Sequence, residues 1–200
     1  METYNWAFEA FVQGLDFTAF DVETTGLDLR KDSIVEIGAV KFNREGEISR
    51  FSTLIDPGIP MPAAASKVNN ITDEMLFGQP SIREVLPAFL NFTADSVLAA
   101  HNAPFDCGFI NFSLSRLYDD GYTTFAALPN RFADTLVMAR RLLPGRTRYN
   151  LQEISASVGL QAQEAHRALD DACLCKELFL FLFENRHVPK NAKKRGGKEK

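Results

Sequence analysis

Cysteine is scarce in this sequence, and no long apolar run is present. The three cysteines, Cys107, Cys173 and Cys175, form no Cys-x-x-Cys pair and are odd in number. This pattern favours a reducing, cytoplasmic compartment. No apolar run approaches the ~20 residues of a membrane span. The first 14 residues contain two Glu and no Lys or Arg, so they lack the basic start of a secretory signal. We therefore expect no membrane association.

Tryptophan and tyrosine are also few, whereas phenylalanine is common. One Trp and four Tyr accompany 17 Phe, most of which lie in apolar segments, and this predicts that they pack in the core. The 200 residues are 46% hydrophobic and 24% charged, which is ordinary for one soluble globular domain. Trp6, Phe8, Phe11 and Val12 are predicted to form one face of a short helix that packs on this domain.

The net charge of −4 is distributed unevenly along the chain. Residues 186–200 contain seven Lys or Arg and one Glu, a balance of +6, so residues 1–185 carry −10. An acidic body is unusual for a protein that binds nucleic acid, but metal-binding carboxylates would supply part of this charge. We divide the chain into an N-terminal helical extension (1–15), a main domain (16–186) and a basic tail (187–200), which is expected to be disordered.

Apolar runs separated by turn signals predict five strands and a set of helices. The strands are expected at residues 17–23, 34–42, 48–55, 96–101 and 131–134, with a hairpin link at 43–46. Helices are expected at residues 81–92, 104–118, 135–143, 150–158 and 168–185, and another is expected to begin after Thr72 as its N-cap. Strands paired first as hairpins and then alternating with helices indicate an α/β domain with a mixed sheet.

Two carboxylates stand one residue apart at the end of the first predicted strand. Side chains alternate along a strand, so Asp21 and Glu23 are expected on the same face, roughly 7 Å apart. Two acids held so close repel each other unless a positive charge lies between them, and a divalent cation meets that need. The alternative is a strand end with two solvated acids.

Further acids are expected near this pair. Asp106 lies in the first turn of a predicted helix that directly follows a strand, where the positive helix end favours an ionised carboxylate. Asp171 shares a face with the apolar stripe of the last helix, whereas Asp170 falls on a more polar face, so we choose Asp171. His166 precedes this helix. Taken alone, Asp106 could simply cap a helix and His166 could simply be exposed.

Three motifs, in this order and spacing, resemble those of the DEDDh family of 3′–5′ exonucleases. They are residues 21–27 (Asp-Val-Glu-Thr-Thr-Gly-Leu), 101–106 (His-Asn-Ala-Pro-Phe-Asp) and 166–172 (His-Arg-Ala-Leu-Asp-Asp-Ala). The likeness covers about residues 16–185 and is strongest to the proofreading epsilon subunit of bacterial DNA polymerase III and its stand-alone relatives. Further agreement lies at residues 34–40, 134–136 and 150–151.

The resemblance implies an RNase H-like fold, with a five-stranded mixed β-sheet flanked by helices. It also implies a 3′–5′ exonuclease that releases nucleoside 5′-monophosphates with two divalent metal ions, Mg²⁺ or Mn²⁺. By motif position, the metal ligands would be four carboxylates and the general base would be His166. The carboxylates are Asp21, Glu23, Asp106 and Asp171. Two such ions can activate a water and stabilise the leaving oxygen, and histidine can accept a proton near neutral pH.

The resemblance also implies substrate contacts at Thr24 and Gly26, an apolar wedge at Leu27 and a strand-orienting role for Asn102. One departure is the Asn-Asn-Ile-Thr stretch at 69–72, where many relatives have a His-Gly-Ile-Thr-like sequence. Asn tolerates the left-handed backbone that Gly would allow, so the turn is expected to survive, whereas a contact made by the missing His would be lost.

We expect single-stranded DNA to be the favoured substrate and a replicative DNA polymerase subunit to be a possible partner. An exoribonuclease like RNase T or oligoribonuclease is the alternative enzyme, because no residue in the sequence decides whether a 2′-OH is sensed. A catalytically inactive binding module on the same fold is the alternative outside the enzymes. The four carboxylates with His166 argue against it, since the fold alone does not require them.

Overall fold

The structure is a computed structural model and describes residues 4–162 and 166–186. Its centre is a five-stranded sheet with the strand order β3-β2-β1-β4-β5. β1 pairs antiparallel with β2 and parallel with β4, so the predicted mixed sheet is confirmed. The strands are β1 (Phe17–Thr24), β2 (Ile34–Asn43), β3 (Gly46–Leu54), β4 (Val97–Ala100) and β5 (Phe132–Asp134).

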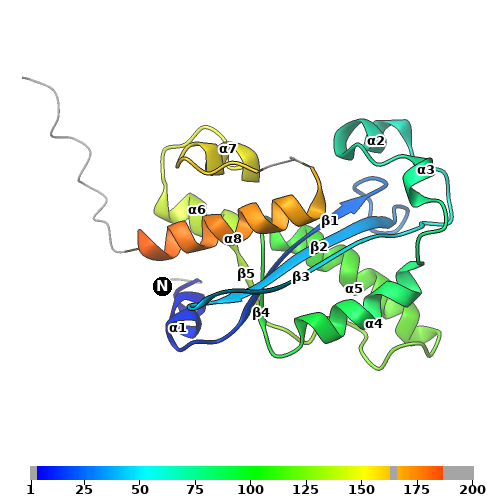
Figure 1. Cartoon of the computed structure of the whole chain (residues 1–200), viewed down its shortest axis with the longest axis horizontal. Helices are drawn as coiled ribbons and strands as arrows, with labels where there is room; N and C mark the ends of the chain where they lie inside the picture. Colours follow the sequence, from blue (N-terminus) through cyan, green and yellow to red (C-terminus); the bar gives the residue numbers. More distant parts are fainter. Residues whose placement is uncertain (1–3, 163–165, 187–200) are drawn as a thin grey trace, which may run out of the picture.

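Helices cover both faces of this sheet (Figure 1). On one face, α8 packs along β1 and β2, and α1, α6 and α7 lie beside it. On the other face, α4 and α5 share a second apolar cluster with the sheet. The helices are α1 (Asn5–Val12), α2 (Ala63–Asn69), α3 (Asp73–Leu76), α4 (Ile82–Thr93), α5 (Ala103–Asp119), α6 (Thr135–Leu142), α7 (Leu151–Ala156) and α8 (Ala168–Glu184).

The side chains of β1 alternate between the two faces of the sheet, and this alternation determines which helices they contact. Phe17 and Ala19 belong to the core under α8, whereas Phe20 and Val22 belong to the core under α4 and α5. All four side chains are at most 5% exposed. The odd-numbered positions of β1 therefore face α8, and the next ones along the strand are the two acids of the first motif.

The predicted apolar face of α1 is partly wrong. Phe8 and Phe11 are buried and join an aromatic cluster with Phe17 and Phe179, but Val12 is 46% exposed. The buried arc of α1 also includes two alanines, Ala7 and Ala10. At 100° per residue this arc is centred near Ala7 and Phe11, which leaves Val12 at its edge.

The structure also contains α2, for which no separate helix was expected, and the remaining differences concern element ends. β4 excludes Ser96 and His101, and β3 begins two residues earlier than expected. Thr72 does occupy the N-cap position of α3, as predicted. The basic tail predicted at 187–200 lies outside the described residues. Within the part of the chain that is described, no helix is long and apolar enough to span a membrane.

Candidate active site

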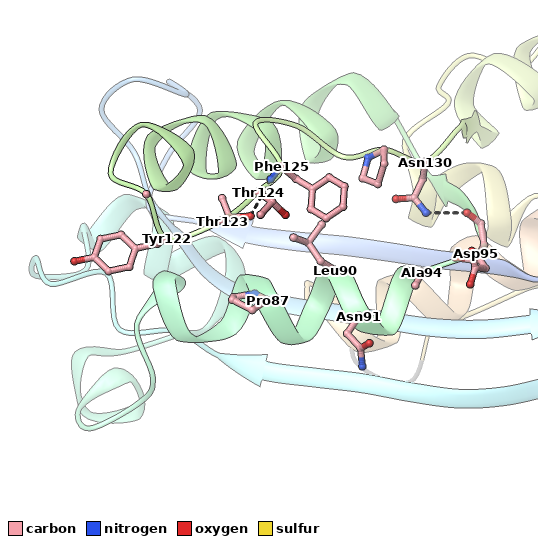
Figure 2. A pocket seen from close by; sticks show the side chains of 13 residues that line it. Pro87, Leu90, Asn91, Ala94, Asp95, Tyr122, Thr123, Thr124, Phe125 and Asn130 are labelled. Carbon is pink, nitrogen blue, oxygen red and sulfur yellow. Dashed lines mark hydrogen bonds between the residues drawn. The ribbon is translucent and has the colours of Figure 1, made fainter.

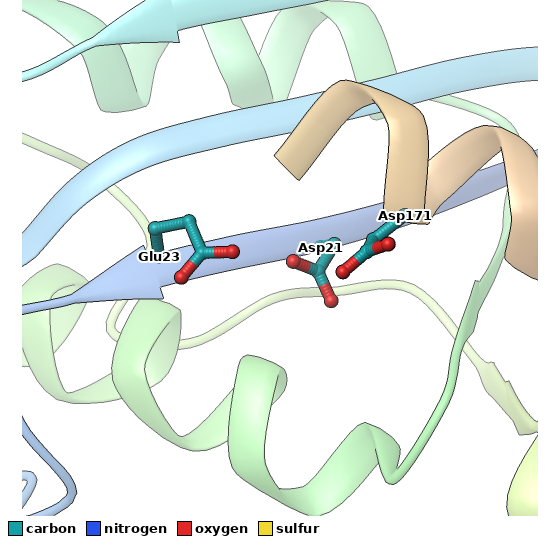
Figure 3. A group of neighbouring side chains, drawn as sticks. All are labelled: Asp21, Glu23 and Asp171. Atoms are coloured by element: carbon teal, nitrogen blue, oxygen red, sulfur yellow. The ribbon is translucent and has the colours of Figure 1, made fainter. Parts of the chain in front are cut away.

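Three carboxylates converge at one end of the sheet (Figure 3). Asp21 and Glu23 project from β1, and Asp171 comes from the first turn of α8 and points toward them. One oxygen from each carboxylate lies within 4.8 Å of the others. Asp21 and Glu23 are partly accessible to solvent, whereas Asp171 is buried. Three oxygen ligands at this spacing suit a hard divalent cation.

The sequence brings α8 this close to β1 through a glycine in β2. A Cβ atom added to Gly38 would lie 2.1 Å from the backbone nitrogen of Leu169, so no larger residue fits without moving the helix. Gly38 is the register partner of Asp21 on the neighbouring strand. The first turn of α8 therefore rests on β2 beside the acids, and Asp171 lies within reach of them.

A buried ion pair fixes the same end of α8. The Glu36 carboxylate, which is 2% exposed, accepts hydrogen bonds from the Arg167 side chain at 2.8 and 3.2 Å. It also accepts one from the backbone N–H of Ala168 at 3.1 Å, at the start of the helix. Glu36 stands directly opposite Glu23 in the sheet register. These bonds tie the N-terminus of α8 to β2 next to the carboxylate group.

Asp106 lies beside the three carboxylates without joining them in the group of closely spaced ligand atoms. Its side chain is 3% exposed, and Oδ1 accepts a hydrogen bond from the backbone N–H of Val22 at 3.3 Å. Its charge nevertheless raises the pKa of Asp21, second only to the effect of burial. The fourth predicted acid is therefore adjacent to the site, and its own backbone contact holds it there.

Burial and mutual repulsion both favour the protonated forms of these acids. Burial, followed by the charges of Asp106 and Asp171, raises the pKa of Asp21 well above its usual range. Burial and then the Asp171 charge raise the pKa of Glu23 to about 8. Burial raises the pKa of Asp106 to about 8 and also raises the pKa of Asp171. A cation among these groups would remove the repulsion and favour their ionised forms.

His166 lies in an exposed turn two residues before α8 and has a left-handed backbone, with φ 63°. Its backbone N–H donates to the Asp171 carboxylate, and its charge lowers the pKa of that group. Gln152 of α7 donates a second hydrogen bond to Asp171, with 2.5 Å between Nε2 and Oδ1. His166, the predicted general base, is thus adjacent to the acids, at the solvent side of the site.

The predicted substrate-contact residues differ in how exposed they are and in what they contact. Thr24 is buried, and its hydroxyl donates to the Gly26 carbonyl at 2.6 Å. Gly26 is packed against the Asp32 carboxylate, which leaves no room for a Cβ. Leu27 is 83% exposed at the end of the same turn. Asn102, at the N-cap of α5, lines a pocket of about 600 Å³ together with Asp21 and Asp171.

The departure at residues 69–72 has a defined structure. Asn70 has φ 58°, so this asparagine does adopt the left-handed backbone that was predicted. The Asn69 side chain donates to the Thr24 carbonyl at 3.4 Å, and a hydrogen bond from it lowers the pKa of Glu23. Asn69 therefore links this turn to the end of β1.

Comparison with known proteins decides the family. Residues 18–179 match the model of the RNase T-type exonuclease family, which is most of the chain. The chain belongs to this exonuclease family. It is 44% identical over 190 residues to the DNA polymerase III epsilon subunit of Treponema pallidum, covering 94% of this chain and 85% of the relative. A PolC-type DNA polymerase III of Clostridium perfringens is 42% identical over 84% of this chain, but the match spans only 11% of that protein.

Solved structures agree with this family. Exonuclease X in complex with 5′-overhanging duplex DNA is 26% identical, with a TM-score of 0.67 over 84% of this chain and 91% of that one. Escherichia coli exonuclease I, solved with a dT13 oligonucleotide, has a TM-score of 0.72 at 16% identity over 86% of this chain and 42% of that one, a likeness of fold alone. The predicted RNase H-like fold is confirmed, and the chain is a 3′–5′ exonuclease of the DEDDh type.

Not every pocket of this exonuclease belongs to the site. A hollow of about 840 Å³ lies between α4 and residues 121–130, and it contains none of the acids described above (Figure 2). Asn130 closes one end of it with hydrogen bonds to the carbonyls of Thr93 and Ser96. The chemistry is therefore expected in the smaller pocket, which includes Asp21 and Asp171.

Sequence reasoning missed Gln152 and the ion pair of Glu36 with Arg167. One signal was available for Glu36, because it is the only charged residue in the apolar run of residues 34–40. A charge in a fully buried strand needs a partner. Nothing in the local sequence indicates that the partner is Arg167, which lies 131 positions away.

Proposed function

We propose that this exonuclease removes nucleoside 5′-monophosphates from the 3′ ends of single-stranded DNA in a reaction that needs two divalent ions, Mg²⁺ or Mn²⁺. The convergence of Asp21, Glu23 and Asp171 within 4.8 Å, with Asp106 beside them, is the observation that supports this most strongly. Burial raises the pKa values of these carboxylates, and the repulsion among them raises the values further. Hard cations with oxygen ligands relieve that repulsion.

The four carboxylates fit such ions by charge and by donor type. When bound, two divalent ions supply an activated water and stabilise the charge that develops on the leaving 3′ oxygen. Asp21, Glu23, Asp106 and Asp171 would hold them. The hydrogen bond from Gln152 to Asp171 orients one of these ligands before anything binds.

The other residues of the site would handle the proton and the substrate. His166, exposed at the edge of the carboxylate group, would accept the proton of the attacking water. The Leu27 side chain would contact the terminal base, an apolar contact that does not depend on which base is present. Thr24 and Gly26 would position the terminal nucleotide beside the acids, and Asn102 would orient the strand.

The choice of DNA rests on the relatives. The named relatives are DNA polymerase III proteins, and Exonuclease X was solved with DNA. By this likeness we propose that the chain acts in the cytoplasm and works with a replicative DNA polymerase. A tagged copy purified from its host should bring that polymerase with it, and recovery of the chain alone would count against this partner.

Matched 5′-labelled DNA and RNA oligomers test the activity. With Mg²⁺ or Mn²⁺, the DNA oligomer should shorten from its 3′ end and the RNA more slowly, and EDTA should stop both. Asp21→Ala should abolish nearly all hydrolysis, whereas a variant of an exposed acid far from the site, Glu45→Gln, serves as the control. Undiminished cleavage in excess EDTA would overturn the metal requirement. Faster cleavage of RNA would favour the exoribonuclease alternative.

A further inference from the structure

Two arginines line the same pocket as the acids Asp21 and Asp171. They are Arg140, near the end of α6, and Arg148, in the loop that leads to α7. Both side chains are exposed. Glu23 and Thr24 do not line this pocket. The arginines therefore lie on the Asp171 side of the carboxylate group, and the predicted contacts of the terminal nucleotide at Thr24 and Leu27 lie on the other side.

These arginines belong to the most basic stretch of the described domain. Residues 135–152 contain four arginines and no acidic residue, whereas residues 1–185 as a whole carry −10. A polyanion approaching such a body meets repulsion everywhere except at local positive patches. A patch that borders the acids is where a nucleic acid strand can reach them.

The loop that carries Arg148 is held in place by its own contacts. The Tyr149 hydroxyl donates to the Leu143 carbonyl at 2.8 Å and accepts from the backbone N–H of Arg146. The Tyr149 carbonyl is 2.6 Å from Nε2 of His101, directly before α5. These bonds attach the loop to the strand end that also precedes Asp106. Arg148 is consequently presented to the pocket from a fixed backbone.

Among the residues that the structure describes, Arg148 forms one ion pair, and a phosphate can replace it. Arg148 Nη1 lies 2.8 Å from Glu153 Oε1, and both side chains are largely exposed, at 71% and 44%. Exposed pairs of this kind stabilise a fold by only ~0–1 kcal/mol. A bidentate contact from Arg to phosphate is stronger, because the planar guanidinium matches the phosphate oxygens.

We propose that Arg140 and Arg148 bind phosphates of the substrate strand on the 5′ side of the bond that is cut. The inference rests on the proposed function and gives the strand a direction. Its 3′-terminal nucleotide lies toward Thr24 and Leu27, its reacting phosphate at the acids, and its preceding phosphates along the arginines. A dinucleotide has no phosphate between nucleosides other than the one cut, so it should not use the arginines.

The experiment compares Arg140→Gln, Arg148→Gln and their combination with Arg141→Gln. Arg141 is the matched control because it is exposed on the same helix as Arg140 but does not line the pocket. Binding is measured by the fluorescence anisotropy of a labelled (dT)12 oligomer with Ca²⁺ in place of Mg²⁺, and a gel verifies that the oligomer stays intact. The double variant should bind ~10-fold or more weakly, and its salt slope should fall by ~0.7 for each lost contact. The control should stay within about twofold of wild type on the same scale.

Hydrolysis separates this role from a general structural effect. In the double variant, KM for the oligomer should rise while kcat and KM for a thymidine dinucleotide stay unchanged. Glu153→Gln removes the competing carboxylate and should tighten oligomer binding. Equal losses in Arg141→Gln, an equal loss on the dinucleotide, or no tightening in Glu153→Gln would overturn the proposal. If the wild-type protein cleaves no nucleic acid, the proposed function fails. The binding measurements still test whether the two arginines bind the oligomer.

Discussion

Asp170 and Asp171 are adjacent carboxylates in different surroundings. Asp171 is 7% exposed, accepts hydrogen bonds from Gln152 and His166, and lies in the group with Asp21. Asp170 is half-buried and lies at a separate small pocket beside Arg50. We expect Asp171→Asn to reduce the rate by ~10²-fold or more, because a ligand charge is lost at the reacting centre. Asp170→Asn should retain most activity, as single-turnover rates on a DNA oligomer can measure.

The role of His166 as the general base can be tested with Asp170→Asn as the control. His166→Ala should fold normally, since the side chain is exposed, and should lose ~10²–10⁴-fold in rate. Asp170→Asn, in the same turn of chain, controls for local disturbance. A variant of His166 with wild-type activity would exclude it from proton transfer, and equal losses in the two Asp variants would show that α8 presents another face to the acids.

Burial of the acids, with the repulsion among them, should make the metal-free protein less stable as the pH rises. The pKa values of Glu23 and Asp106 are raised to about 8, compared with ~4 in an unfolded chain. Between these values the folded state binds protons that the unfolded state has lost, so it gains stability that disappears as the pH rises through 8. The melting temperature of the EDTA-treated protein should fall by a few degrees between about pH 6.5 and about pH 8.

His101 and Cys107 have shifted pKa values that act mainly outside this pH interval. Burial lowers the pKa of His101, which therefore matters below the ~6.5 of an ordinary histidine. Burial raises the thiol pKa of Cys107 to about 12, so its effect begins above the ~8.5 of a free thiol. Asp21→Asn should raise the melting temperature near pH 8 and flatten its decline. Parallel curves for wild type and variant would contradict the like-charge repulsion.

For single residues, the periodicity of the sequence predicted only what depends on local geometry. The two-residue repeat of β1 correctly placed Asp21 and Glu23 on one face, and the helical repeat correctly placed Asp171 on the buried stripe. The same reasoning misplaced Val12, because the buried arc of α1 is determined by which neighbours surround the helix. Gln152 could not be predicted, since its contact depends on how the last two helices pack.

The contact between β2 and α8 is the element that positions the site. Glu36 receives three hydrogen bonds from the start of α8, and Gly38 leaves space for its backbone. We expect Glu36→Gln to destabilise the protein by about 1–3 kcal/mol, because a buried charge-assisted network is broken. We also expect ~10-fold or more slower hydrolysis, because Asp171 shifts with the helix. Thermal unfolding, hydrolysis rates and Mn²⁺ affinity by electron paramagnetic resonance measure these effects.

A second ion pair on the same helix provides the control. Glu47 of β3 pairs with Lys176 of α8 at 3.0 Å, away from the acids. Glu47→Gln should leave the rate and the Mn²⁺ affinity within about twofold, because this pair lies away from the acids. If Glu36→Gln lowers only the melting temperature and leaves Mn²⁺ affinity unchanged, the pair stabilises the fold without positioning Asp171.

Elements were predictable where chain neighbours are also spatial neighbours. The hairpin signal at residues 43–46 correctly joined β2 to β3. The alternation of strands and helices correctly indicated a mixed sheet, in which β4 and β5 are parallel. The close approach of α8 to β2 was not foreseen, although Gly38 stands out as a glycine within a strand. A missing Cβ indicates that something approaches closely, but the sequence does not say which element it is.

Across the whole sequence, two stretches carry several basic residues and few or no acids, whereas the remaining basic residues are interspersed with acids. Within the described residues, the stretch is 135–152, which borders the acids. The chain ends in another such stretch, the predicted basic tail, which stays a prediction because it lies outside the described residues. Both stretches would attract phosphate, and the first contributes Arg140 and Arg148 to the pocket that holds Asp21 and Asp171.

Deleting residues 187–200 separates these two contributions. The segment carries six basic side chains, Lys190, Lys193, Lys194, Arg195, Lys198 and Lys200. If they contact phosphates, the shortened protein should have a higher KM for long strands, and its binding should have a salt slope smaller by up to ~4. The kcat on a dinucleotide should stay unchanged, since that substrate is too short to reach beyond the acids. Identical salt slopes for the full-length and shortened proteins would leave the tail without a role in nucleic acid binding, and a protein partner would then be the next hypothesis to test.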